Sequence, residues 1–159
     1  MKNNNIIQSF YHALRGFKDA FLRERNLRIH LSVANLILVF AWVYGIDRNG
    51  YAQLIISITM VIFAELVNSA VEKAVDTATS TYRFDAGHAK DFAAAATLVT
   101  AVGSICVGIT LFASLSRIEN ALVKIFTSPV LMCVFALLLI FDILMIMYPK
   151  FMKRKRKGK

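Results

Sequence analysis

Four long stretches with almost no charged side chain dominate this sequence. They cover residues 29–46, 51–64, 92–116 and 125–141, and the second continues as a helical pattern to residue 76. A bilayer-spanning helix needs about 20 predominantly apolar residues, and each stretch reaches or approaches that length. The 159 residues are 57% hydrophobic with a mean hydropathy of +0.57, a balance that is unusual for a soluble domain. We therefore expect an all-α integral membrane protein with four transmembrane helices.

Basic residues flank these stretches and form no patch within a separate soluble domain. The net charge is +9, and residues 150–159 contain seven Lys or Arg and no acid. Residues 1–28 and 73–90 hold most of the other basic side chains. An even number of spans places these three regions on one side of the membrane, which the positive-inside rule makes the cytoplasmic side. We expect both termini in the cytoplasm and no nucleic-acid partner.

An apolar stripe precedes the first span. Its residues recur at intervals of three and four, the spacing of one helix face: Ile7, Phe10, Leu14, Phe17 and Phe21. Lys and Arg side chains lie between them, a pattern typical of an amphipathic helix in the membrane interface whose basic groups face anionic headgroups. The simplest interpretation is a surface anchor, in which Glu24 only neutralises neighbouring arginines.

Polar residues end the second apolar stretch. Glu65, Asn68, Glu72 and Asp76 are spaced 3, 4 and 4 apart, so they share an arc of roughly 80° on one helix face. A carboxylate within a membrane-length helix is costly and by default marks a site that binds a cation or moves a proton. The positive-inside orientation places these four residues at the cytoplasmic end of the span.

Several ionisable residues from other segments belong to the same cytoplasmic layer. They include Arg15, Glu24 and Arg28 before the first span, and Lys90 and Asp91 at the start of the third. Acids that hold Mg²⁺, a possible base and cations for phosphate oxygens are what phosphoryl transfer requires. The sequence has no phosphate-cradling Gly-rich motif and no HExxH, GxSxG or CxxC motif, so soluble nucleotide hydrolases, metalloproteases and serine hydrolases are unsupported.

Two other functions fit the acidic face. It could line the pathway of a non-enzymatic ion- or proton-conducting oligomer, or its polar residues could only pair helices in a structural membrane protein. Glu24, Lys90 and Asp91 discriminate between them and a nucleotide site, because a pathway along the second span has no use for these three residues.

The motifs resemble those of the small bacterial integral-membrane diacylglycerol kinase and undecaprenol kinase family. The resemblance rests on ELVNSAVEKAVD at residues 65–76, GHAKD at 87–91, ALRG at 13–16 and ERNLRIH at 24–30. It covers roughly residues 8–113 in order and spacing, and the NLRIH segment is more similar to the undecaprenol kinase branch. It implies a homotrimeric kinase in the bacterial inner membrane, with an N-terminal surface helix and three spans. Such an enzyme phosphorylates a lipid hydroxyl with MgATP, undecaprenol being the favoured acceptor and diacylglycerol the second.

The resemblance also assigns roles to individual residues. Glu65 would be the catalytic base and contact the lipid, Asn68 would orient the reacting groups, and Arg28 would contact lipid or phosphate oxygens. Glu24 and Glu72 would hold Mg²⁺, which replaces the neutralising role of Glu24. The nucleotide would be bound by residues from four segments: His12, Arg15, Glu24, Glu72, Tyr82, Arg83, Lys90 and Asp91. For Asp76, pairing with Lys73 or Arg83 or backbone capping is the expectation.

The chain departs from the family after its third span. We divide it into an amphipathic interfacial segment (1–28), a three-span kinase core (29–113, with 8–28 contributing to the site), a loop and fourth span (114–149), and a basic cytoplasmic tail (150–159). Asp142 lies within the fourth span, where an acid is expected to pair with a polar side chain or reach the interface rather than perform chemistry.

Overall fold

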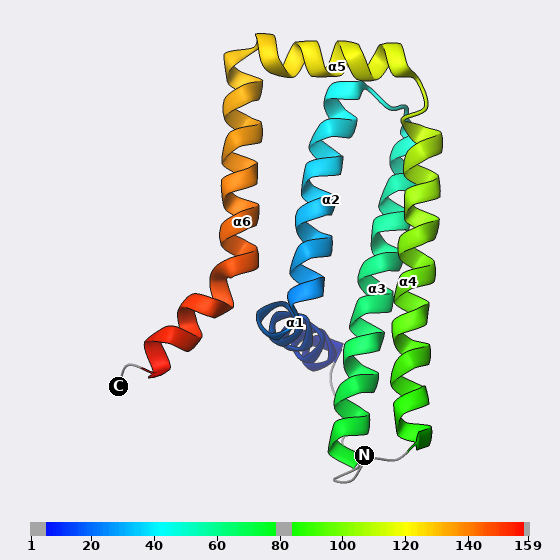
Figure 1. Ribbon diagram of the computed structural model, residues 1–159, viewed down its shortest axis with the longest axis vertical. Coiled ribbons are helices and arrows are strands. Elements are labelled where there is room, and N and C mark those ends of the chain that lie inside the picture. The colour runs from blue at the N-terminus through cyan, green and yellow to red at the C-terminus, as the bar shows by residue number, and fades with distance from the viewer. Residues whose placement is uncertain (1–5, 79–83, 158–159) are drawn as a thin grey trace.

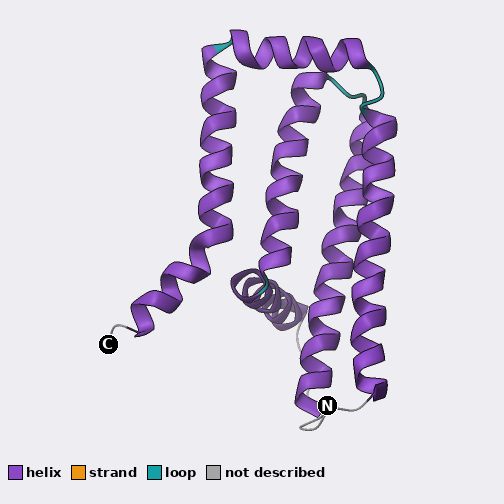
Figure 2. Ribbon diagram, viewed as in Figure 1, coloured by secondary structure: helices purple, strands orange, loops and turns teal. Residues whose placement is uncertain are grey.

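A computed structural model of the chain describes residues 6–78 and 84–157, and the described residues are almost entirely helical (Figure 2). They form six helices and contain no strand: α1 (Ile6–Arg23), α2 (Arg25–Tyr44), α3 (Arg48–Ala78), α4 (Phe84–Leu111), α5 (Leu115–Thr127) and α6 (Pro129–Lys157).

Four of these helices are long and apolar enough to cross a membrane: α2, α3, α4 and the Pro129–Met147 part of α6. They run alongside one another, and α1 lies at the end of the bundle toward which the C-terminal part of α6 also extends (Figure 1). The expectation of an all-α multi-pass membrane protein with four spans is confirmed.

The N-terminal helix α1 lies across the bundle and leaves its apolar stripe uncovered. Ala20 is its only buried side chain, whereas Ile7, Phe10 and Leu14 are 67–80% exposed. An isolated stripe of this kind is stable in water only if something apolar covers it. Its position beside the ends of the spans matches the interfacial helix expected from the sequence.

Helices α3 and α4 form a closely packed antiparallel pair, with α2 against α3. The Ser57 hydroxyl donates a hydrogen bond of 2.9 Å to that of Ser104 across the pair. At the opposite end from α1, Gly45 ends α2 in the left-handed region at φ 76°, a conformation that glycine adopts without steric cost. Asp47 then begins α3 by accepting the Gly50 N–H at 2.8 Å.

Helix α5 lies where we expected a loop. Only its ends fall within the third and fourth charge-free stretches, and the residues between them, 117–124, were assigned to a loop. Ala121 and Ile125 pack against Val43 and Tyr44 at the end of α2. The Arg117 guanidinium lies 4.4 Å from the centre of the Tyr44 ring and donates to the backbone carbonyls of Tyr44 and Gly45. It therefore satisfies carbonyls that the end of α2 leaves unpaired.

The fourth span, in α6, packs against α2 and α5. Asp142 is 3% exposed, and its Oδ1 accepts a hydrogen bond of 3.2 Å from the Asn35 side-chain amide of α2. This contact confirms the expectation that Asp142 pairs with a polar group.

Candidate functional site

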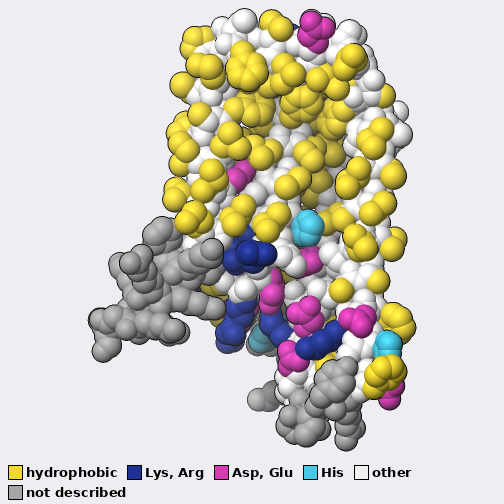
Figure 3. Space-filling view, viewed as in Figure 1, with side chains coloured by type: hydrophobic (Ala, Val, Ile, Leu, Met, Phe, Trp, Pro, Cys, Tyr) yellow, Lys and Arg dark blue, Asp and Glu magenta, His cyan; other side chains and the backbone are white. Residues whose placement is uncertain are grey.

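Charged side chains gather at the α1 end of the bundle, below the apolar region of the spans (Figure 3). The layer forms where the C-terminal end of α1, the beginning of α2 and the second half of α3 meet. Acids from two of these segments lie close together there. The fold thus brings Glu24, Glu65 and Glu72 to the same layer.

Glu65 lies deepest in this layer and is 3% exposed. It is one of the last residues of the long apolar run of α3, so its carboxyl group is placed beside the beginning of α2. The Asn26 side chain is within hydrogen-bonding reach of the carboxyl group, and His30, Glu24 and Glu72 are close enough to interact with it electrostatically. Two further acids and a histidine therefore surround one buried carboxyl group.

Asn68 and Glu72 continue the same face of α3. The Asn68 side-chain amide donates to Glu72 Oε1 at 3.3 Å, which orients that carboxylate. Asn68 is 8% exposed, and its Oδ1 is buried without a hydrogen-bond partner among the described residues. A buried acceptor without a donor costs about 1–3 kcal/mol, so this oxygen is suited to receive a hydrogen bond from a bound molecule.

Glu24 lies in the one-residue link between α1 and α2. Its backbone is extended at φ −93° and ψ 114°, and its side chain makes no capping hydrogen bond to α2. Instead, its Oε1 lies 3.1 Å from Lys73 Nζ. Lys73 is therefore the partner of Glu24, whereas from the sequence we considered it as a partner of Asp76.

The oxygen donors of Glu24 and Glu72 fit magnesium chemically. Among the described side chains, no three His, Cys, Asp or Glu residues converge closely enough to hold a metal by themselves. Mg²⁺ is commonly held by one or two carboxylates together with substrate phosphates and water. Two carboxylates beside a nucleotide are therefore a suitable set, and the Asn68 hydrogen bond leaves the second oxygen of Glu72 available.

A second cluster of charged side chains lies further along α3 and at the beginning of α4. Lys90 of α4 forms an ion pair with Asp76 of α3. Of the two partners that we expected for Asp76, Lys73 is paired with Glu24 instead, and Arg83 lies outside the described residues. Asp91 follows Lys90 and is exposed. Asp76 lies four residues beyond Glu72, about 6 Å along the helix axis, so this group continues the layer outward.

Three predicted residues precede these groups in the chain. His12 and Arg15 are exposed on α1. Arg28 is 4% exposed, and its Nη1 donates to the Phe21 carbonyl oxygen at 2.7 Å. The structure therefore buries Arg28 beneath the end of α1, where it holds α1 against α2, and its guanidinium is not open to a phosphate group. Tyr82 and Arg83 lie outside the described residues.

Three members of the site were not predicted from the sequence. Lys73 follows Glu72, but its contact with the α1–α2 link depends on how the helices pack, which the periodicity of α3 alone does not predict. Asn26 lies within the ERNLRIH segment and His30 ends it. Neither was named as a site residue, although their spacing of four places both on one face of α2.

Known proteins resemble this chain over the part that forms the site. The model of the family "Prokaryotic diacylglycerol kinase" matches residues 11–112, about two thirds of the chain. The chain belongs to the prokaryotic diacylglycerol kinase family. The matched region contains every predicted site residue, and it ends before α5, so α5 and α6 lie outside the family's shared core.

Three relatives illustrate the match. The chain is 34% identical over 105 residues to a diacylglycerol kinase of Synechocystis, an alignment that covers 65% of this chain and 60% of that protein. It is 32% identical over 109 residues to an undecaprenol kinase of Bacillus subtilis, covering 69% of this chain and 89% of that protein. It is 30% identical over 100 residues to a diacylglycerol kinase of Escherichia coli K12, covering 63% and 82%. The family and these names indicate a phosphotransferase with an alcohol acceptor.

Proposed function

We propose that this protein transfers the γ-phosphoryl group of MgATP to the hydroxyl of a membrane lipid alcohol, with undecaprenol preferred over diacylglycerol. The observation that carries the proposal is the buried Glu65 carboxyl group, beside Asn26 and His30 and within electrostatic reach of Glu24 and Glu72. An alcohol is a weak nucleophile, and a positioned carboxylate partly withdrawn from water is a suitable base for it.

In the proposed step, Glu65 receives the hydroxyl proton as the lipid oxygen bonds to the γ-phosphorus. The bond from that phosphorus to the oxygen bridging it to the β-phosphate breaks, and ADP leaves. Asn68 orients the reacting groups, and its buried Oδ1 has no donor among the described residues. Positioning of this kind supplies a large part of the catalysis of phosphoryl transfer.

Glu24 and Glu72 would hold the magnesium ion, which supplies neutralisation of the phosphate charge when bound. Lys73 lies 3.1 Å from Glu24, so it limits the negative charge of the pair before nucleotide binds. Lys90 and Asp91 would contact the nucleotide from α4, together with His12 and Arg15 from α1 and Tyr82 and Arg83 from the α3–α4 connection.

The preference for undecaprenol rests on the sequence between α1 and α2. The ERNLRIH segment supplies Glu24, Asn26 and His30, all of which interact with Glu65, and its NLRIH part resembles the undecaprenol kinase branch more than the diacylglycerol kinases. The Bacillus subtilis relative carries that name, and the match covers 89% of it. Diacylglycerol is the competing acceptor in the experiment below.

We place the site at the cytoplasmic surface of a bacterial inner membrane, with both termini in the cytoplasm. The basic residues of α1 and of the C-terminal tail support this orientation, since α1 and the end of α6 lie at the same end of the bundle. We also propose a homotrimer. Helix α4 has no buried residue in the single chain. Its Gly103 has open space where a side chain would project, with no neighbouring atom within 4 Å, so a second helix could approach closely there.

Phosphate transfer from labelled ATP to undecaprenol and diacylglycerol in parallel tests the proposal, with and without Mg²⁺. Labelled lipid should form with undecaprenol at the higher kcat/KM. Glu65→Gln should lower kcat by about 10²–10⁴-fold, the usual contribution of a general base, while MgATP binding persists. Glu119→Gln, which changes an exposed acid on α5, is the matched control. No transfer to either lipid, or equal loss in both variants, contradicts the proposal.

A further inference from the structure

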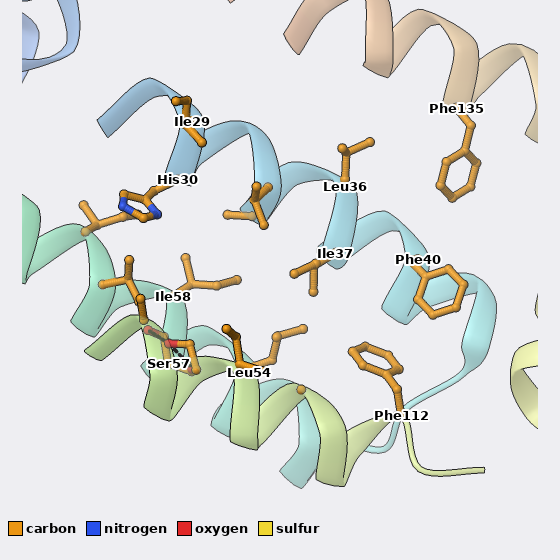
Figure 4. Close-up of a pocket in the computed structure, with 18 residues that line it drawn as sticks. Ile29, His30, Leu36, Ile37, Phe40, Leu54, Ser57, Ile58, Phe112 and Phe135 are labelled. Atoms are coloured by element: carbon orange, nitrogen blue, oxygen red, sulfur yellow. Dashed lines mark hydrogen bonds between the residues drawn. The ribbon is translucent and has the colours of Figure 1, made fainter. Parts of the chain in front are cut away.

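An apolar groove of about 620 Å³ lies between α2 and the α3–α4 pair. Figure 4 shows its walls, and Figure 3 shows the hollowed hydrophobic surface between α6 and the α3–α4 pair. Its volume is within the range of about 300–1,000 Å³ that is usual for ligand sites. The lining includes two hydroxyls, those of Ser57 and Ser104, and they hydrogen-bond to each other. The groove is therefore suited to an apolar occupant.

One end of the groove reaches the proposed active site. His30 of α2 belongs to the lining, and it is also one of the groups that interact electrostatically with the Glu65 carboxyl. A molecule in the groove would thus have its nearer end beside the proposed base. This continuity gives the groove a polar mouth and an apolar body, the arrangement that a lipid alcohol requires.

Three phenylalanines from three parts of the chain line the other end. Phe40 of α2 and Phe112, which follows α4, have ring centres 5.4 Å apart. Phe135 of α6 extends toward both in Figure 4. All three pack against the buried cluster that joins the ends of α2 and α5, including Tyr44 and Ile125. The aromatic end is therefore anchored and does not consist of loosely held side chains.

The length of the groove follows from α2. Its lining runs from Ile29 to Phe40, a rise of eleven residues along one helix, which corresponds to about 16 Å at 1.5 Å per residue. A groove of this length accepts the part of a lipid tail nearest the hydroxyl. A tail longer than the groove has to turn into the bilayer at the end that the three phenylalanines line.

The position of Phe135 is set by a polar contact. Phe135 and Asp142 are seven residues apart on α6, two helical turns, so both face α2. Asp142 accepts its hydrogen bond from Asn35 of α2 at 3.2 Å. Since this contact fixes the height of α6 along α2, it also fixes the height of Phe135 at the end of the groove.

We infer that this groove holds the hydroxyl-proximal part of the lipid acceptor's tail, and that Phe135 of the fourth span sets how much of the tail the groove holds before it turns into the bilayer. The inference rests on the proposed function and extends it to acceptor selection. Family membership does not supply it, because the matched region ends at residue 112 and Phe135 lies beyond it.

The test compares two prenols that differ by one isoprene unit, farnesol and geranylgeraniol, as acceptors for the full-length enzyme in detergent micelles. Phe135→Ala should raise the ratio of kcat/KM for geranylgeraniol over farnesol by about tenfold, the lower end of the discrimination that a hydrophobic pocket achieves per methylene. Phe135→Trp should lower the ratio. Phe141→Ala removes an exposed phenylalanine of the same helix, 58% accessible, and should leave the ratio unchanged. A ratio that changes less than twofold in both Phe135 variants, or equally in Phe141→Ala, overturns the inference.

A second measurement does not depend on turnover. A geranylgeraniol analogue with a diazirine at the tail end, irradiated with the wild-type protein, should attach to the α6 peptide that contains Phe135. Attachment without phosphoryl transfer to any alcohol would refute the proposed kinase function while supporting the groove. Transfer without attachment to α6 would retain the kinase and overturn the role of the fourth span.

Discussion

The hydrogen bond between Asn35 and Asp142 provides a test of how the fourth span is held. The Asp142 carboxyl is 3% exposed, and Oδ2 is buried without a hydrogen-bond partner among the described residues. Oδ1 accepts from the Asn35 amide at 3.2 Å. Asn35→Leu keeps the side chain's approximate size and removes the donor to Oδ1. Both carboxyl oxygens of Asp142 then lack a hydrogen-bond partner among the described residues.

The expected cost follows from these contacts. An interhelical hydrogen bond within a membrane is worth about 0.6 kcal/mol on average and at most about 1.7. A buried acceptor left unpaired costs a further 1–3 kcal/mol or so. We expect Asn35→Leu to lower the free energy of unfolding by about 2 kcal/mol. In an Asp142→Leu background the same substitution should cost less than about 0.5 kcal/mol, because replacing both partners by apolar groups is close to neutral.

Unfolding by SDS titration in mixed micelles, followed by the helical circular dichroism signal, measures all four members of this double-mutant cycle. Asn120→Leu changes an exposed asparagine on α5 and should lie within about 0.5 kcal/mol of the wild type. If Asn35→Leu is as stable as the wild type, the contact does not hold the helices together. If its cost is the same with and without Asp142, the two residues act independently and the reasoning fails.

Two further predictions concern α5 and the proposed metal site. Arg117→Ala removes the contact with the Tyr44 ring and the donors to two backbone carbonyls. SDS titration should therefore show that the free energy of unfolding falls by about 1–3 kcal/mol. The control Lys124→Ala, at an exposed position of α5, should leave it almost unchanged. Lys73→Met frees Glu24 from a half-exposed ion pair, and such pairs are worth up to about 1 kcal/mol. The Mg²⁺ concentration for half-maximal activity should therefore fall by up to about fivefold. An increase in that concentration would show that Lys73 assists the metal.

The sequence predicted the spans and the acidic face because both depend on local periodicity. Helix α3 carries Glu65 and Glu72 on one face whatever surrounds it, so a spacing of three and four suffices to align them. The stripe of α1 is equally local. Topology placed Glu24 in the same cytoplasmic layer, the resemblance made it a metal ligand, and the structure brings it within electrostatic reach of Glu65.

Contacts between helices could not be read in this way. The pairing of Lys73 with Glu24, and of Lys90 with Asp76, depends on how far α3 slides along α1 and α4. Helix α5 was missed because its middle, which includes the buried Ala121, is a short segment between two apolar runs that were assigned to membrane spans. The groove has no sequence signal, since its lining consists mostly of ordinary apolar residues that lie far apart in the chain.

The length of α3 has an energetic consequence. Its 31 residues extend about 46 Å, roughly 16 Å more than the hydrocarbon thickness of a bilayer. If α3 begins at the far boundary of the hydrocarbon, Glu72 lies about 6 Å beyond the near boundary, in the headgroup layer, while Glu65 lies about 4 Å inside the apolar region. In the proposed reaction the triphosphate therefore does not have to enter the hydrocarbon, where the cost of its charge would be prohibitive. The uncharged lipid hydroxyl can move between Glu65 and the headgroup layer instead, because burying it in hydrocarbon costs far less than burying a phosphate charge.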